Sequence, residues 1–131
     1  MNVTITAFYA AIFGIALIAL SLRVTLARRH ARVGVGFGGN EQLAQVCRVQ
    51  ANFVEYVPFA LFLMVLYELN GGSREILHGA GFTLLVARAL HSWGLSHNPG
   101  ISFGRVWGTT FTWLVIIVLS GANLYRLVVP G

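Results

Sequence analysis

Three polar side chains follow one another along an otherwise apolar segment. Arg48, Asn52 and Glu55 are spaced i, i+4 and i+7, so on a helix they share one face within about 60°. A charge near the centre of a bilayer costs roughly 2.5–3.5 kcal/mol on insertion scales, and such residues usually face a partner or a water-filled cavity. The stripe is therefore a candidate binding site, in which the arginine suits a carboxylate and the glutamate suits an ammonium group.

A structural role is the alternative for the same residue types. Arg48 and Glu55 would form a buried ion pair that holds helices together, because charges inside a membrane protein usually pair. Arg88 would pair with Glu55 across two helices, and His91 would be a hydrogen-bonded interior histidine. Arg105, near a membrane edge, would extend to lipid head groups.

The composition is that of a membrane protein. Of the 131 residues 56% are hydrophobic and only 10% are charged, against about 25% charged in a soluble domain. The net charge of +5 comes from nine basic and four acidic residues, and the basic residues flank apolar runs without forming a nucleic-acid-binding motif. We expect no nucleic-acid partner.

Cys47 is the one cysteine, and the four histidines lack metal-ligand spacing. We therefore expect no disulfide within the chain and no metal site.

Apolar runs predict four membrane-spanning helices, at residues 3–22, 42–69, 76–95 and 106–129. A run of 20 residues spans about 30 Å as a helix, enough for the hydrocarbon core. The connections are an Arg-rich and then Gly-rich segment at 27–41, a turn at 70–73, and a loop at 96–104 broken by Pro99. The first run has no basic leader, and we expect it to be retained. The sequence thus predicts one all-α domain over residues 1–131, an integral membrane four-helix bundle.

The arginines also predict the orientation of the chain. Those beside the first and third connections are Arg23, Arg28, Arg29, Arg32 and Arg105. Arg74 and Arg126 mark the opposite side. The positive-inside rule then places both termini on the non-cytoplasmic side of the membrane, which we expect to be a bacterial inner membrane. Close helix approach is expected at Gly14, Gly94 and Gly121, although no glycine pair with GxxxG spacing stands out.

The second and third apolar segments carry a family resemblance. The pattern Arg-x-x-x-Asn-x-x-Glu-x-x-Pro is matched by Arg48, Asn52, Glu55 and Pro58, and ARALHSWG follows in the third segment. Over most of its length the chain resembles the MAPEG proteins, the membrane-associated proteins in eicosanoid and glutathione metabolism. This resemblance implies a four-helix bundle that assembles as a homotrimer. It also implies glutathione as co-substrate, bound between neighbouring subunits near the cytosolic face.

The resemblance implies a role for each matching residue. The glutathione ligands would be Arg48, Gln50, Asn52, Glu55, Tyr56, Arg88 and His91. Arg105 would be the catalytic residue that activates the glutathione thiol, because a nearby guanidinium favours the thiolate. The chain departs from the pattern at Leu95, where glutathione-using members commonly have a tyrosine.

Three functions follow in order of preference. The first is a glutathione-dependent transferase or peroxidase that acts on lipophilic electrophiles or hydroperoxides, with membrane lipids and other copies of the chain as partners. The alternative is a non-catalytic lipid-binding membrane protein of the same fold, which Leu95 favours. A small multidrug transporter ranks last, because such proteins carry a glutamate in the first helix, and here that helix is uncharged before Arg23.

Overall fold

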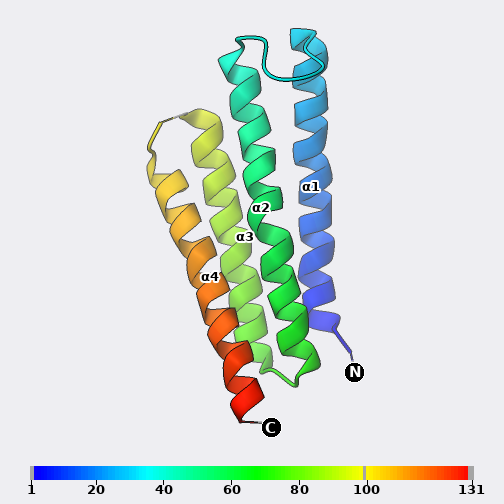
Figure 1. Cartoon of the computed structure of the whole chain (residues 1–131), viewed down its shortest axis with the longest axis vertical. Helices are drawn as coiled ribbons and strands as arrows, with labels where there is room; N and C mark the ends of the chain where they lie inside the picture. Colours follow the sequence, from blue (N-terminus) through cyan, green and yellow to red (C-terminus); the bar gives the residue numbers. More distant parts are fainter. Residues whose placement is uncertain (1, 99, 130–131) are drawn as a thin grey trace.

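A computed structural model describes residues 2–98 and 100–129, and within those ranges the chain forms four α-helices (Figure 1). They are α1 (Thr4–Ala31), α2 (Glu41–Leu69), α3 (Arg74–His97) and α4 (Phe103–Val128). The helices alternate in direction, so α1 starts at the same end of the bundle at which α4 ends (Figure 1). The all-α prediction is confirmed. The predicted break at Pro99 lies outside the described residues.

The helices form an open arrangement in which α2 and α3 are central. Helix α1 packs on α2 and α3, and α4 packs on α3 and α2. Among the described residues α1 and α4 do not contact each other, and they lie at opposite sides of the bundle (Figure 1). The outer faces of α1 and α4 are therefore free to meet lipid or another protein.

Helix α1 is longer than predicted. The apolar run ends at Leu22, but the helix continues to Ala31, because the following residues are mostly good helix formers and the basic last turn suits the negative end of the helix dipole. It ends where Arg32 adopts a left-handed conformation with φ 58°, and the Val33 N–H donates to the Arg28 carbonyl at 3.1 Å, a Schellman-type closure. The connection to α2 is correspondingly shorter than the predicted 27–41.

The helix starts have different capping groups. Asn40, Ser73 and Ser102 accept a hydrogen bond from a backbone N–H in the first turn of α2, α3 and α4, as expected for N-cap residues. Helix α1 has no side-chain cap of its own. Instead Glu68, near the end of α2, accepts from the backbone N–H groups of Ile5 and Thr6 at 2.9 and 2.8 Å. This carboxylate fixes the start of α1 to the end of α2.

The hydrophobic core fills the half of the bundle that holds the termini. Its members include Phe13 of α1, Phe53 and Met64 of α2, Leu84 of α3 and Leu119 of α4, each at most 4% exposed. Toward the other end, beyond Asn52 on α2 and Arg88 on α3, the buried positions include polar side chains. The bundle therefore has an apolar half that holds it together and a polar half at the α1–α2 and α3–α4 connections.

Three helices in the described ranges, α1, α2 and α4, are long and apolar enough to cross a membrane. Helix α3 does not meet that criterion, because it carries Arg74, Glu75 and Arg88 together with three histidines and three glycines. The four-span topology thus stays a prediction. Many large apolar side chains are exposed on α1 and α4, such as Ile15 at 75% and Ile117 at 67%, as expected for surfaces that face lipid.

Glycines set the distance between α3 and α4. A Cβ at Gly104 would lie 2.7 Å from the Leu90 carbonyl oxygen, one at Gly108 would lie 2.7 Å from the Ala87 carbonyl oxygen, and one at Gly94 would lie 2.7 Å from the Arg105 nitrogen. The expectation for Gly94 is confirmed. The sequence analysis missed Gly104 and Gly108, which have GxxxG spacing and allow close backbone approach.

The same expectation is wrong for Gly14 and Gly121. No described atom lies within 4 Å of a Cβ built at either position. Both residues lie on exposed parts of their helices, so they do not mark a contact within the subunit.

We expect Gly108→Ala to lower the free energy of unfolding by about 1–3 kcal/mol, because its methyl group would overlap α3. Gly14→Ala is the matched control: its methyl group meets open space, so it should leave stability unchanged or raise it by up to about 1 kcal/mol. Circular dichroism of the purified protein in detergent during thermal unfolding measures both. Equal stability of the two variants would mean that the α3–α4 contact tolerates a side chain.

Candidate functional site

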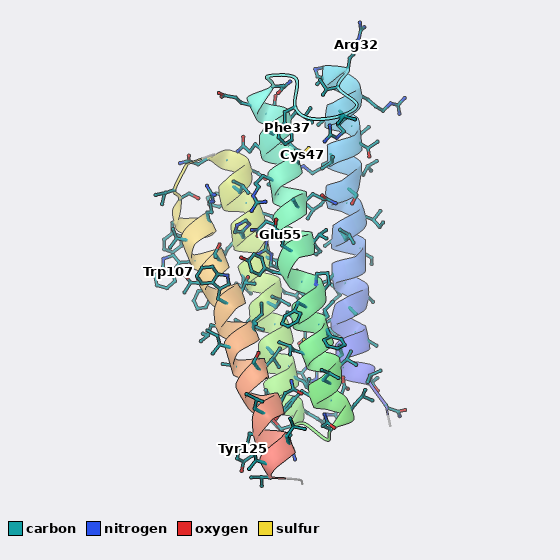
Figure 2. All side chains as sticks on the ribbon, viewed as in Figure 1. Arg32, Phe37, Cys47, Glu55, Trp107 and Tyr125 are labelled. Atoms are coloured by element: carbon teal, nitrogen blue, oxygen red, sulfur yellow. The ribbon has the colours of Figure 1, made fainter. Side chains whose placement is uncertain are left out.

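Arg48 and Glu55 form an ion pair on the surface of α2. The Arg48 Nη1 donates to Glu55 Oε1 at 2.9 Å and Nη2 donates to Oε2 at 3.3 Å, a two-pronged contact that suits a guanidinium and a carboxylate. The side chains are 52% and 46% exposed. Glu55 lies near the middle of α2 (Figure 2). The two residues thus pair as the structural alternative predicted, but the pair is half-exposed and lies within α2, so it is not the predicted buried pair that holds helices together.

A separate buried cluster surrounds the guanidinium of Arg88, which is 3% exposed. Its Nη2 donates to Asn52 Oδ1 of α2 at 2.7 Å and lies 3.2 Å from His91 Nδ1 on the next turn of α3. Its Nη1 lies 3.5 Å from the hydroxyl oxygen of Thr112 on α4. One cation therefore contacts polar groups on three helices.

The predicted alternative of an Arg88–Glu55 pair is wrong. Among the described residues, the one salt bridge is Arg48–Glu55, and the guanidinium of Arg88 contacts the neutral side chains of Asn52, His91 and Thr112. Its Nε is buried and makes no hydrogen bond within the described part of the chain. A buried cation without a touching carboxylate is costly, so the cluster favours a negative charge nearby.

His91 is held in one orientation by its neighbours. Its ring is 2% exposed, and a Cβ added at Gly108 would lie 2.7 Å from the His91 Cβ. Since the Arg88 guanidinium can only donate, Nδ1 of His91 accepts and the neutral ring carries its proton on Nε2. This supports the interpretation of His91 as a hydrogen-bonded interior histidine.

An open cleft of about 830 Å³ lies beside this cluster, where the start of α2 meets the end of α3 and the start of α4. Its lining residues are Glu41, Gln42, Ala44, Gln45, Arg48, Leu95, Gly100 and Arg105. Two arginines that are 57 positions apart in the sequence thus line one cavity. The volume is within the usual range of small-molecule sites.

The close contact of Gly104 with α3 and the Ser102 cap of α4 position Arg105 at the mouth of this cleft. Its backbone N–H donates to the Ser102 side chain at 3.3 Å, and its neighbour Gly104 packs directly on α3. The guanidinium Nη1 donates to the Gly100 carbonyl at 3.2 Å. The side chain is half-buried, so Arg105 is part of a defined loop-to-helix junction.

The lining of the cleft is partly apolar. Leu95 is buried with 4% exposure and stands at the position where the family resemblance implies a tyrosine. The Gln45 amide donates a hydrogen bond to the Leu95 carbonyl. This hydrogen bond links α2 to the end of α3. The Leu95 side chain gives the cleft an aliphatic surface at the place where a tyrosine would supply a hydroxyl group.

The structure separates the eight predicted site residues into groups. Arg48 and Arg105 line the cleft, while Asn52, Arg88 and His91 are buried behind it. Glu55 is paired with Arg48, and Tyr56 is half-buried. Gln50 is turned to the other side of α2, where its amide lies 3.5 Å from the Ser21 hydroxyl oxygen of α1.

Sequence reasoning missed Gln42, Gln45 and Thr112. A usable signal existed for Gln45, because it lies three residues before Arg48 and therefore on nearly the same helix face. Thr112 gave no signal in the sequence, since only the packing of α4 on α3 brings it to Arg88.

The comparisons with known proteins agree with the motif. The model of the MAPEG family matches residues 6–125. The chain is also similar to the inner membrane protein YecN of Escherichia coli strain K12, with 33% identity over 121 residues that cover 92% of this chain and 91% of YecN. The YecN protein of the O6:H1 strain gives the same values.

We expect Asn52→Leu to destabilise the protein by about 2–3 kcal/mol, because Arg88 would lose its shortest hydrogen bond while its charge stays buried. The double variant Asn52→Leu/Arg88→Met should recover most of this loss, since it removes the charge as well. Thr112→Val, which removes only a 3.5 Å contact to Arg88, should cost less than Asn52→Leu. Chemical unfolding in detergent measures the free energy of unfolding of each variant for the double-mutant cycle. If the losses caused by the two single substitutions simply add up in the double variant, the burial of Arg88 does not depend on Asn52.

Proposed function

This chain belongs to the MAPEG family of membrane proteins, and on that premise we propose that it is a glutathione-dependent transferase or peroxidase. Its second substrates would be lipophilic electrophiles or hydroperoxides. The glutathione site would be the cleft between α2, α3 and α4. The proposal draws on the family, whose name refers to eicosanoid and glutathione metabolism, and on the chemistry of the residues at that cleft.

The observation that carries the proposal is the convergence of Arg48 and Arg105 on one open cleft. Glutathione has two carboxylates, one ammonium group and a thiol. Arginine side chains donate two parallel hydrogen bonds to a carboxylate, and the buried Arg88 behind the cleft adds positive potential. Glu41 at the cleft and Glu55 beside Arg48 are the acidic groups within reach of the ammonium group.

The proposed chemical role of Arg105 is to stabilise the thiolate of bound glutathione. The thiol loses its proton to water, and the guanidinium compensates the negative charge on sulfur. In conjugation the thiolate forms a C–S bond with the electrophile as the leaving group departs with its electron pair. In the peroxidase reaction, the thiolate attacks the hydroperoxide and breaks its O–O bond. The alcohol leaves, and a second glutathione converts the sulfenic acid to the disulfide and water.

We also propose that the site is completed in a homotrimer. The Arg48–Glu55 pair is half-exposed near the middle of a helix that is long and apolar enough to span a membrane, and a pair facing lipid at that depth would be expensive. A neighbouring subunit would cover it. Gln50 and Arg48 lie on opposite faces of α2, so a site that uses both would combine residues of two subunits.

The proposed location is a bacterial inner membrane with both termini on the non-cytoplasmic side. The similar YecN proteins are named as inner membrane proteins. Arg28 and Arg29 in the last turn of α1, and Arg32 directly after it, lie at the same end of the bundle as Arg105, which is in the first turn of α4. The cleft would then open to the cytoplasm, where glutathione is abundant.

A lipid-binding protein without turnover is the second candidate. The buried Leu95 at the cleft wall favours it, because the aliphatic side chain supplies no hydroxyl group to the thiol. The two candidates differ in whether bound glutathione becomes a thiolate that reacts.

We expect Arg105→Ala to lower the turnover of a chlorodinitrobenzene-type acceptor about 100-fold, the usual effect of removing one group that stabilises a developing anion. Glutathione affinity should change little, because Arg48 remains. The ultraviolet thiolate band that appears when glutathione is added should disappear in the same variant, as seen by difference spectroscopy.

Arg29→Ala is the matched control for Arg105→Ala, because Arg29 is an exposed arginine at the same end of the bundle and does not line the cleft. It should keep both the turnover and the thiolate band. Full activity of Arg105→Ala would remove that residue from the mechanism. Glutathione binding without a thiolate band in the parent protein would favour the lipid-binding candidate.

We expect Glu55→Gln to weaken glutathione binding and subunit assembly together, since it leaves Arg48 without its carboxylate at the proposed subunit contact. The loss should be about 1–3 kcal/mol in each. Isothermal titration measures the affinity, and analytical ultracentrifugation in detergent measures the subunit number. If both are unchanged, the pair is a surface feature of a single subunit.

A further inference from the structure

A second cavity system lies on the opposite half of the bundle from the glutathione cleft. A cavity of about 220 Å³ follows the contact between α3 and α4 near Thr83 and Leu114, and a cavity of about 530 Å³ continues toward Tyr125 and Arg126. The two meet at Ile76, which lines both. Together they form one groove, the α3–α4 groove, along the outer side of the two helices.

Two glycines keep this groove open. Gly79 and Gly121 line it, and no described atom lies within 4 Å of a Cβ built at either position. This contrasts with Gly94, Gly104 and Gly108, where the partner helix fills the space. Packing within the subunit therefore does not explain Gly79 and Gly121, whose missing side chains leave room for another molecule.

The length of the groove corresponds to one leaflet of a membrane. From Leu114 to Arg126, α4 rises about 18 Å, and half of a hydrocarbon core is roughly 15 Å thick. The inner part is lined almost entirely by apolar groups, including Ala80, Val115 and Val118. An extended acyl chain has the shape and the chemistry of this space.

The outer end of the groove carries a fixed cation. The Arg126 Nη2 donates to the Gly71 carbonyl at 2.6 Å, and the guanidinium lies 6.0 Å from the centre of the Tyr67 ring. Tyr125, at the end of α4 (Figure 2), is 63% exposed, as is typical of tyrosines at a membrane–water interface. Within the described residues Arg126 forms no salt bridge.

We propose that the α3–α4 groove binds a phospholipid, with one acyl chain along Ile76 and Gly121 and the phosphate at Arg126. The charge at one end and the apolar floor along the rest match an amphiphile with an anionic head group. A purely apolar molecule would leave the arginine unmatched, and a free phosphate would leave the floor empty. The site lies away from the glutathione cleft, so it does not depend on the proposed enzyme activity.

The test compares three probes added to the purified full-length protein in detergent: phosphatidylglycerol, a diacylglycerol with the same acyl chains, and inorganic phosphate. Native mass spectrometry counts retained lipid, and thermal unfolding measures stabilisation by binding. We expect phosphatidylglycerol to bind at least about tenfold more tightly than diacylglycerol, because only the former offers a charge-assisted hydrogen bond to Arg126. Phosphate alone should have no effect.

Matched variants assign the binding to the groove. Gly121→Leu fills the floor and should abolish retention of the lipid, whereas Gly14→Leu, at an open glycine of α1, should keep it. Arg126→Gln should reduce the preference for phosphatidylglycerol about tenfold, and Arg74→Gln, at the same end but outside the groove, should retain it.

The proposal is overturned if diacylglycerol binds as tightly as phosphatidylglycerol, if phosphate alone gives the same stabilisation, or if Gly121→Leu retains the lipid. A change in subunit number for Gly121→Leu would also overturn it, because the groove would then be a contact between copies. If that variant does not fold, the lipid preference of the parent protein and of Arg126→Gln decides the question.

Discussion

The buried guanidinium of Arg88 is the constraint on which the polar half of the bundle depends. A charge inside a membrane protein has to be surrounded by partners, and here they come from α2 through Asn52, from α4 through Thr112, and from His91 one turn along α3. The contacts to Asn52 and Thr112 join α2 and α4 to α3. The close approach of α4 at Gly104 and Gly108 is what brings Thr112 within reach.

Apolar packing and buried polar groups are divided along the length of the bundle. The apolar core gathers at the end with the termini, where Glu68 also fixes the start of α1. The opposite end has fewer buried apolar side chains and contains the buried cation and the open cleft. Such a division allows the polar half to hold charges that a uniformly packed bundle would exclude, because the stability comes from elsewhere.

Positive charge appears at both ends for different chemical reasons. At the cleft, Arg48 and Arg105 converge from two helices onto a space that is wide enough for a polar ligand. At the far end of the α3–α4 groove, Arg126 lies at the outer end of a narrow apolar space. The net charge of +5 is therefore not spread evenly. The guanidinium of Arg48 contacts Glu55, that of Arg105 donates to the Gly100 carbonyl, and that of Arg126 donates to the Gly71 carbonyl and lies over the Tyr67 ring.

The sequence by itself determined the membrane character, the four helical segments and the motif Arg48, Asn52, Glu55 and Pro58 that led to the family. These depend on local composition and helical periodicity, which are visible in one dimension. The helical spacing also shows that Arg48 and Glu55 lie on the same face of α2, so their pairing could be predicted. The errors of prediction lay at the end of α1, where good helix formers extend a helix beyond its apolar run, and at the glycines.

Only the tertiary structure decided which polar residues meet. Periodicity cannot tell whether Arg88 turns toward Glu55 or toward Asn52 and Thr112, because that depends on the rotation of three helices about their axes. Nor can it show that Arg105 shares a cleft with Arg48, since their distance is set by the close contact of α3 and α4. The same holds for Gly14 and Gly108, which look alike in the sequence and differ only in what lies opposite each of them.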